Sequence, residues 1–181
     1  VAEDYRRLFG EREQRLTSTR SGEDDAAFAA ELLESAKALD DAPRMQKYLY
    51  TRAFVLAQAD SSGLETAQQA YDVLARQEPA GAAERADTFL ETLQSWQRTS
   101  RGDRREKIEH MYLDMILRAA EQAWRHSRLE KAEQLYRKAR AVTRRGPLGQ
   151  YLRETVQHIA NERKLMQQLE VLEKRAEDEP D

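Results

Sequence analysis

The 181-residue chain contains no cysteine, only 4 prolines and 7 glycines, and no long hydrophobic run. The lack of cysteine excludes disulfide bonds and thiolate chemistry. The scarcity of proline and glycine leaves few residues that interrupt helices. Alternating β-branched and polar residues bounded by turn residues are also missing, so strand signals are absent. No apolar run is long enough to span a membrane.

Charged residues make up 35% of the chain and apolar residues 40%. Both charge signs are interspersed with Ala, Leu and Gln, which is typical of a helical protein with solvated outer faces. The length fits one domain or one short repeat array. Because the chain begins at Val1 rather than Met, we expect that a leader has been removed or that the chain is part of a larger exported or multidomain protein. Its compartment therefore stays open between the cytoplasm and export.

Apolar residues recur at helical spacing in eight segments that are separated by turn-forming residues. The predicted helices span about residues 2–16, 21–39, 43–58, 62–76, 81–97, 103–125, 127–142 and 148–174. We expect residues 1–146 to form an array of helical hairpins and residues 147–176 to form a long capping or association helix. Residues 177–181 form an acidic tail.

Two stretches that begin 65 residues apart, 62–74 and 127–139, are alike. They share Ser, Leu, Glu, Ala, Gln and Tyr at equivalent positions, and such an internal echo is typical of stacked repeats. Each stretch opens with Ser-x-x-Glu, which predicts a capping box in which the Ser and Glu side chains satisfy backbone N–H groups. The predicted boxes pair Ser62 with Glu65 and Ser127 with Glu130.

Segment 127–142 resembles the second helix of a tetratricopeptide (TPR) repeat, a unit of about 34 residues in which two helices pack closely through small residues. Ala132, Tyr136 and Ala139 occupy its small, aromatic and small positions. In the preceding helix, Ala120 takes the glycine position of the family. Ala123 takes the tyrosine position, which is a departure from the family pattern.

Segment 62–76 carries the same pattern less completely. Ala67 and Tyr71 match the small and aromatic positions, Leu74 replaces the second Ala, and Pro79 stands at the family's terminal proline. Residues 94–103 carry no third copy, so the strict alternation of two helices is broken. The resemblance therefore implies an all-α fold, an irregular TPR-like array of about eight antiparallel helices with a long C-terminal helix. A closed helical bundle is the alternative.

The resemblance implies a non-enzymatic scaffold that binds a protein or a peptide. In TPR-like arrays the first helix of each hairpin lines the concave surface, which is where extended partners bind. The predicted first helices here are 43–58 and 103–125. Their polar residues are the candidate concave-face contacts, namely Arg44, Lys47, Arg52, Asp114 and Arg118.

Charge is distributed unevenly, since residues 98–145 carry 14 Lys and Arg against 7 Asp and Glu. If helices 103–125 and 127–142 form an antiparallel hairpin, the basic residues of 98–107 and 137–145 meet at one end. Such a patch could bind nucleic acid or phosphate. A solvated helix face is the interpretation that we favour, because no aromatic platform is interleaved with the charges. The candidate residues are Arg101, Arg104, Arg105, Lys107, Arg137, Lys138, Arg140, Arg144 and Arg145.

The sequence offers no constellation of catalytic or metal-binding residues. His110, His126 and His158 are far apart, and none has a second histidine at ligand spacing. No glycine-rich phosphate loop or nucleophile elbow is present. We therefore predict neither an enzyme nor a cofactor or metal site.

The remaining apolar side chains are predicted either to lie in the core or to contact a partner. Trp96, Trp124, Tyr48, Tyr71 and Tyr136 fall on the apolar stripes of their helices, which predicts core positions. A narrow seam near the end of the last helix predicts contact with a second copy of the chain or with another domain. The seam consists of Leu165, Leu169 and Leu172.

Overall fold

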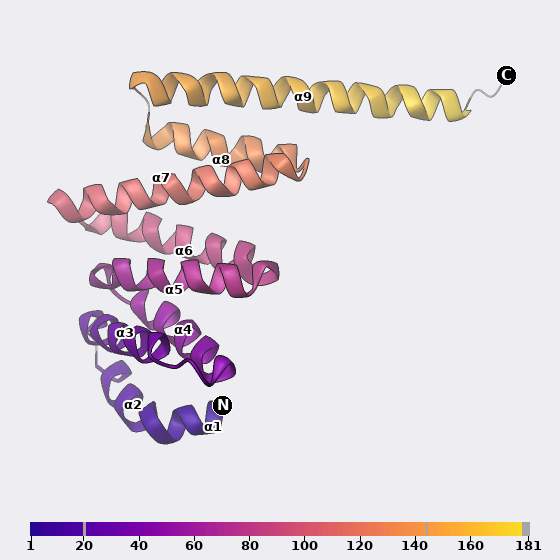
Figure 1. Cartoon of the computed structure of the whole chain (residues 1–181). Coiled ribbons are helices and arrows are strands. Elements are labelled where there is room, and N and C mark those ends of the chain that lie inside the picture. Colours follow the sequence, from indigo (N-terminus) through magenta and orange to yellow (C-terminus); the bar gives the residue numbers. More distant parts are fainter. Residues whose placement is uncertain (20, 144, 179–181) are drawn as a thin grey trace. The chain divides into compact units, whose positions relative to one another are not determined.

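The computed structural model describes residues 1–19, 21–143 and 145–178, and over these residues the chain is helical and contains no strand (Figure 1). The prediction of an all-α protein is confirmed. The chain divides into two compact units, Val1–Ile108 and Glu109–Asp181. None of the described helices combines the length and the apolarity that crossing a membrane requires.

The first unit begins with a helix that changes its winding. α1 (Ala2–Tyr5) and α2 (Glu11–Thr17) flank a π-helical stretch, Arg6–Gly10. Tyr5 is buried, and its ring lies 5.0 Å from that of Tyr48. Leu8, an apolar residue of the predicted helix 2–16, is 63% exposed. A π-helical stretch contains more residues per turn than an α-helix, so it rotates the following side chains away from the expected face.

Four longer helices follow in the first unit: α3 (Gly22–Lys37), α4 (Pro43–Ala57), α5 (Leu64–Gln77) and α6 (Pro79–Thr99). Each packs against the next. Pro43 and Pro79 occupy the first turns of α4 and α6, where the missing N–H of proline costs no helical hydrogen bond. The largest fully buried side chains of this core are Phe28, Phe89, Leu32, Leu49, Leu74 and Leu93.

The echo segment in α5 takes part in this core through an aromatic cluster. The ring of Tyr71 lies 6.2 Å from that of Phe54 on α4 and 6.1 Å from that of Phe89 on α6. Phe54 and Phe89 meet edge to face at 5.6 Å, a geometry that aromatic rings prefer. The cluster therefore joins three successive helices.

The predicted capping box at the start of α5 is wrong. Gly63 precedes the helix, and no side chain caps it. The Asp60 carboxylate instead accepts the backbone N–H of Ser62 at 2.7 Å and caps the short 3-10 turn Ser61–Gly63. This turn runs so close to α4 that a Cβ on Gly63 would lie 2.1 Å from the carbonyl oxygen of Ala57. The tight turn delays the start of α5 and leaves Ser62 outside it.

The second unit contains most of α7 (Gly102–Arg125), together with α8 (Leu129–Val142) and α9 (Gly146–Asp178). The predicted capping box of Ser127 and Glu130 is also wrong, because Arg128 precedes α8 without a side-chain cap. Ser127 has a φ of 56° and closes α7 instead. Its N–H donates to Trp124 and the N–H of Arg128 donates to Ala123, both at 2.9 Å. This is the Schellman arrangement, which usually carries glycine at the position of Ser127.

α9 has a packed half and an exposed half. Leu152, Val156 and Ile159 are buried, and α9 packs against α8. From Lys164 to Arg175 every residue is exposed, and α9 extends past α8 (Figure 1). Leu165, Leu169 and Leu172 are 60%, 53% and 58% exposed. The predicted seam is thus present on the surface of the helix, and its contact with a partner remains a prediction.

Candidate functional site

The basic residues at the start of α7 are all exposed and belong to the first unit. Lys107 Nζ forms an ion pair with Glu65 of α5 at 3.2 Å. The Ser62 N–H holds the pKa of Asp60 below its usual range, and the positive charge of Arg104 lowers it further. Part of this charge is therefore engaged with acidic residues of the same unit.

The basic residues at the end of α8 and beyond it belong to the second unit. Arg137, Lys138, Arg140 and Arg145 are exposed, and Arg144 lies outside the described residues. Arg137 forms an ion pair with Glu133, one turn earlier on α8, at 2.5 Å. The two halves of the predicted patch thus lie in different units, and their meeting at one end of a hairpin stays a prediction.

The candidate concave-face residues of α4 have different surroundings. Arg44 is exposed. Arg52 forms an ion pair with Glu13 of α2, and the hydroxyl of Tyr5 donates a hydrogen bond to Glu13 at 2.7 Å. Burial raises the pKa of Tyr5, while the hydrogen bond from Arg52 opposes the rise. Arg52 therefore helps hold the N-terminal helices against α4.

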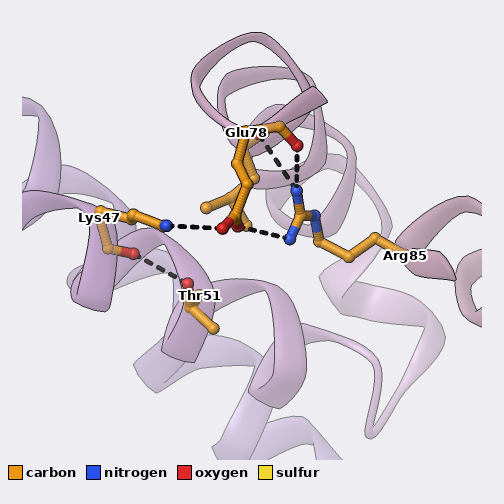
Figure 2. Close-up of polar contacts among 5 residues, drawn as sticks. Lys47, Thr51, Glu78 and Arg85 are labelled. Carbon is orange, nitrogen blue, oxygen red and sulfur yellow. Dashed lines mark hydrogen bonds and ion pairs between the residues drawn. The ribbon is translucent and has the colours of Figure 1, made fainter. Parts of the chain in front are cut away.

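Lys47, the third candidate on α4, belongs to a clamp that joins α4, α5 and α6 (Figure 2). Its ammonium lies 3.0 Å from a carboxylate oxygen of Glu78, the residue between α5 and α6. The other oxygen of Glu78 accepts from Arg85 at 3.0 Å, and Arg85 also donates to the Glu78 carbonyl at 2.8 Å. Hydrogen bonds from Lys47 and then Arg85 hold the pKa of Glu78 below its ordinary value of 4.5. The clamp fixes the turn between two helices.

On α7, Asp114 and Arg118 form an exposed ion pair at 2.9 Å. One turn further on, Glu121 and Arg125 form a second exposed pair at 2.5 Å. The four residues are spaced by four, three and four positions, which places them on one face of the helix. The two predicted residues therefore continue into a longer polar stripe with alternating charge.

The polar stripe leads to a groove of about 490 Å³ in the second unit, here called the aromatic groove. α7 contributes four of its lining residues, α8 contributes one and α9 contributes one. The aromatic groove is lined by Leu117, Glu121, Trp124, Arg125, Tyr136 and Tyr151. It combines three aromatic rings with one carboxylate and one guanidinium. A concave site with aromatic walls and few polar groups is typical of ligand-binding sites.

Trp124 is held in place on several sides. Its indole N–H donates to Glu162 of α9 at 2.9 Å. The ring of Tyr136 stands at 89° to the indole with centroids 6.2 Å apart, and the imidazole of His158 lies 5.7 Å away. Trp124 therefore presents a pre-oriented ring.

Tyr136 and Tyr151 complete the aromatic walls with different exposure. Tyr136 is only 4% exposed and Tyr151 is 55% exposed. Burial raises the pKa of Tyr136, and the nearby Tyr151 and Glu121 raise it further. The aromatic groove thus has an inner wall formed by the buried Tyr136. The exposed ring of Tyr151 and the carboxylate of Glu121 are accessible from solvent.

α8 also contains a buried carboxylate that sequence reasoning did not single out. The side chain of Glu133 is 5% exposed. It pairs with Arg137 on α8 and, at 3.2 Å, with Arg163 on α9. Buried charges require such partners because desolvation is costly. Glu133 therefore ties α8 to α9.

The three histidines are all exposed: His110 lies on α7, His126 in the turn after α7, and His158 on α9. Over the part of the chain that the structure describes, no group of His, Asp or Glu side chains is arranged to hold a metal ion.

The aromatic groove contains none of the candidate contacts chosen from the sequence. Leu117, Glu121 and Trp124 are spaced by four and three positions, so the sequence alone places them on one face of α7. Tyr136 and Tyr151 join this face only when α8 and α9 pack beside it. The comparisons with known proteins add no further guide, because no family model, curated protein or solved structure matches the chain.

Proposed function

We propose that the chain is a non-enzymatic interaction module that binds a peptide segment of a partner protein in the aromatic groove. The observation that carries this proposal is the set of three aromatic rings from three helices, with Trp124 oriented by Glu162 and Tyr136. Trp and Tyr contribute strongly to protein interfaces because they bury a large area with few rotatable bonds. A pre-oriented ring also loses little conformational entropy when a partner binds.

The polar stripe of α7 supports the same proposal. Asp114, Arg118, Glu121 and Arg125 offer both donors and acceptors beside the rings. Peptide-binding surfaces need such a polar rim because it satisfies the polar groups of the partner around an apolar centre. The sequence-based choice of Asp114 and Arg118 as contacts is kept in this proposal.

We also propose that the helices form the irregular, antiparallel TPR-like array that the sequence resembles. Ala132 and Ala139 of α8 are fully buried and Tyr136 is nearly so. These are the small, aromatic and small positions through which a second TPR helix packs. In α5, Ala67 is fully buried and Tyr71 contacts two neighbouring helices. Such a scaffold acts through extended surfaces.

Binding of nucleic acid or phosphate is the alternative function, and the surroundings of the basic residues favour it less. Lys107 and Arg137 have acidic partners at 3.2 and 2.5 Å. Titration with generic DNA and RNA at low salt tests the alternative. We expect no binding. Salt-sensitive binding that is lost when Arg104 and Arg140 are replaced by Gln would support the alternative and contradict the peptide proposal.

The peptide proposal is tested by selecting binders from a random peptide display library and measuring their affinity for variants. Tyr151→Ala removes an exposed ring of the aromatic groove, so we expect it to weaken the selected peptides by about tenfold or more. Val55→Ala is the matched control, because Val55 is 50% exposed on α4 and lies outside the groove. Equal affinities for both variants, or a library that yields no binder, would contradict the proposal.

A further inference from the structure

We propose that the aromatic groove receives a cationic side chain, lysine or arginine, of its peptide partner, with Glu121 as the charge partner of that side chain. This inference rests on the proposed function, since it names the chemical group that enters the same groove. The rings of the groove, the carboxylate beside them and the exposure of the neighbouring guanidinium all favour a cationic group.

The rings provide faces that attract a cation. The face of an aromatic ring is electron-rich, and a cation within about 6 Å of the ring centre is attracted to it. Trp124 and Tyr136 both line the groove and stand nearly perpendicular to each other, at 89°. Tyr151, 55% exposed, adds a ring that an incoming side chain can reach from solvent.

Glu121 provides the opposite charge at the rim. Among the described residues that line the groove it is the carboxylate, and it is 54% exposed. Burial raises the pKa of Tyr136, and the proximity of Glu121 and Tyr151 raises it further. The carboxylate of Glu121 is therefore close enough to act electrostatically on Tyr136, which forms the inner wall of the aromatic groove.

The guanidinium of Arg125 already pairs with Glu121, which shows that this carboxylate can bind a cationic group. The pair is 2.5 Å long, but the Arg125 side chain is 75% exposed. Exposed ion pairs of residues one helical turn apart contribute little stability. An incoming ammonium or guanidinium that also contacts the rings can therefore replace Arg125 at small cost. Arg125 therefore competes with the ligand for Glu121, so removing the charge of Arg125 should strengthen ligand binding.

Two other occupants would use the same groove differently. An apolar side chain would need the rings and neither charge. An acidic side chain would pair with Arg125 and be repelled by Glu121. Substitution of the two charged residues therefore separates the three possibilities.

The first experiment titrates the intact chain with the N-acetyl amides of lysine, arginine, norleucine and glutamate, and follows the assigned indole N–H signal of Trp124 by NMR. Norleucine matches the aliphatic chain of lysine without its charge. We expect lysine and arginine derivatives to bind about three- to tenfold more tightly than norleucine. Equal binding of lysine and norleucine, a preference for glutamate, or no shift with any probe would overturn the inference.

The second experiment repeats the titration with lysine on charge variants. Glu121→Gln should lower the affinity for the lysine derivative toward that of norleucine, whereas Arg125→Gln should increase it because the competing cation is gone. Glu34→Gln, in an exposed pair with Lys37 on α3, is the control and should change nothing. Weaker lysine binding in Arg125→Gln, or unchanged binding in Glu121→Gln, would contradict the cationic ligand.

These outcomes are distinguishable from failure of the proposed function. If selected peptides bind the aromatic groove equally well with and without a lysine or arginine, the interaction module stands and the cationic ligand falls. If lysine and arginine derivatives shift Trp124 while selected peptides bind elsewhere, the cationic site stands and the peptide module falls.

Discussion

At the scale of single residues, Ser127 is the clearest case in which local conformation overrides a sequence motif. Its φ of 56° lies in the left-handed region, where a Cβ is unfavourable and glycine is preferred. The residue is also exposed. The hydrogen bonds of Ser127 and Arg128 to the end of α7 hold the turn in this conformation.

We therefore predict that Ser127→Gly raises the free energy of unfolding by about 0.5–1 kcal/mol, because it relieves the left-handed strain. Ser127→Ala keeps the Cβ and should give no gain. Chemical denaturation of the three proteins measures both differences. A loss of stability in both variants would indicate that the serine side chain caps α8 after all.

Glu78 is the residue whose charge most clearly supports the fold at a turn. Its folded-state pKa is lowered by hydrogen bonds from Lys47 and then from Arg85. A lowered folded-state pKa means that ionised Glu78 stabilises the folded protein above the ordinary value of 4.5. The stabilisation is lost as the pH falls through the folded-state pKa.

We predict that Glu78→Gln destabilises the protein at pH 7 and that the difference from the natural chain disappears in acid, below the folded-state pKa of Glu78. Glu84→Gln, which changes an exposed carboxylate on α6, is the matched control. Denaturation curves at a series of pH values provide the measurement. A difference between Glu78→Gln and the natural chain that does not vary with pH would contradict the role of the charge.

At the scale of elements, the helices were predictable because their stripes and breaks lie in local sequence. Before α9, the predicted boundaries agree with the structure to within two residues. α9 extends four residues beyond its predicted end, to Asp178. The two capping boxes were wrong because Ser62 and Ser127 serve the preceding turns, and those turns depend on how the chain leaves α4 and α7.

The first part of α9 is packed within the second unit, whereas its second part is exposed. Ile159 is fully buried, whereas residues 164–175 are exposed. Glu162 and Arg163, between the two parts, bind Trp124 and Glu133. The contribution of α9 to stability should therefore end near Lys164.

We predict that a chain ending at Lys164 keeps its free energy of unfolding to within about 0.5 kcal/mol, since residues 165–175, which it loses, are exposed. Ile159→Ala, in contrast, should lower it by about 2–5 kcal/mol because it leaves a cavity. Denaturation of both chains measures the contrast. A loss of several kcal/mol on truncation would mean that residues 165–181 contribute to the packed structure.

The same truncation tests the predicted contact through Leu165, Leu169 and Leu172. If the seam pairs with a second copy, light scattering should give twice the chain mass for the intact protein and a single chain mass for the chain ending at Lys164. A monomeric mass for both chains would contradict self-association through the seam.

At the scale of the whole molecule, the sequence predicted the all-α class but not the position of the candidate site. Trp124 and Tyr136 were predicted as core residues, and Tyr136 is indeed buried. Their second role arises because Tyr151, from α9, brings an exposed ring beside them. That contact depends on long-range packing, which local periodicity does not encode. The spacing of Leu117, Glu121 and Trp124 could have identified one face of α7, but not the residues that α8 and α9 add to it.

NMR titration with a selected peptide shows whether a peptide binds in the aromatic groove. Trp124 lines the groove, whereas Trp96 is 7% exposed in the first unit and serves as an internal control. We predict that the peptide shifts the indole N–H signal of Trp124 and leaves that of Trp96 unchanged. A bound peptide that shifts Trp96 but leaves Trp124 unchanged would contradict the claim.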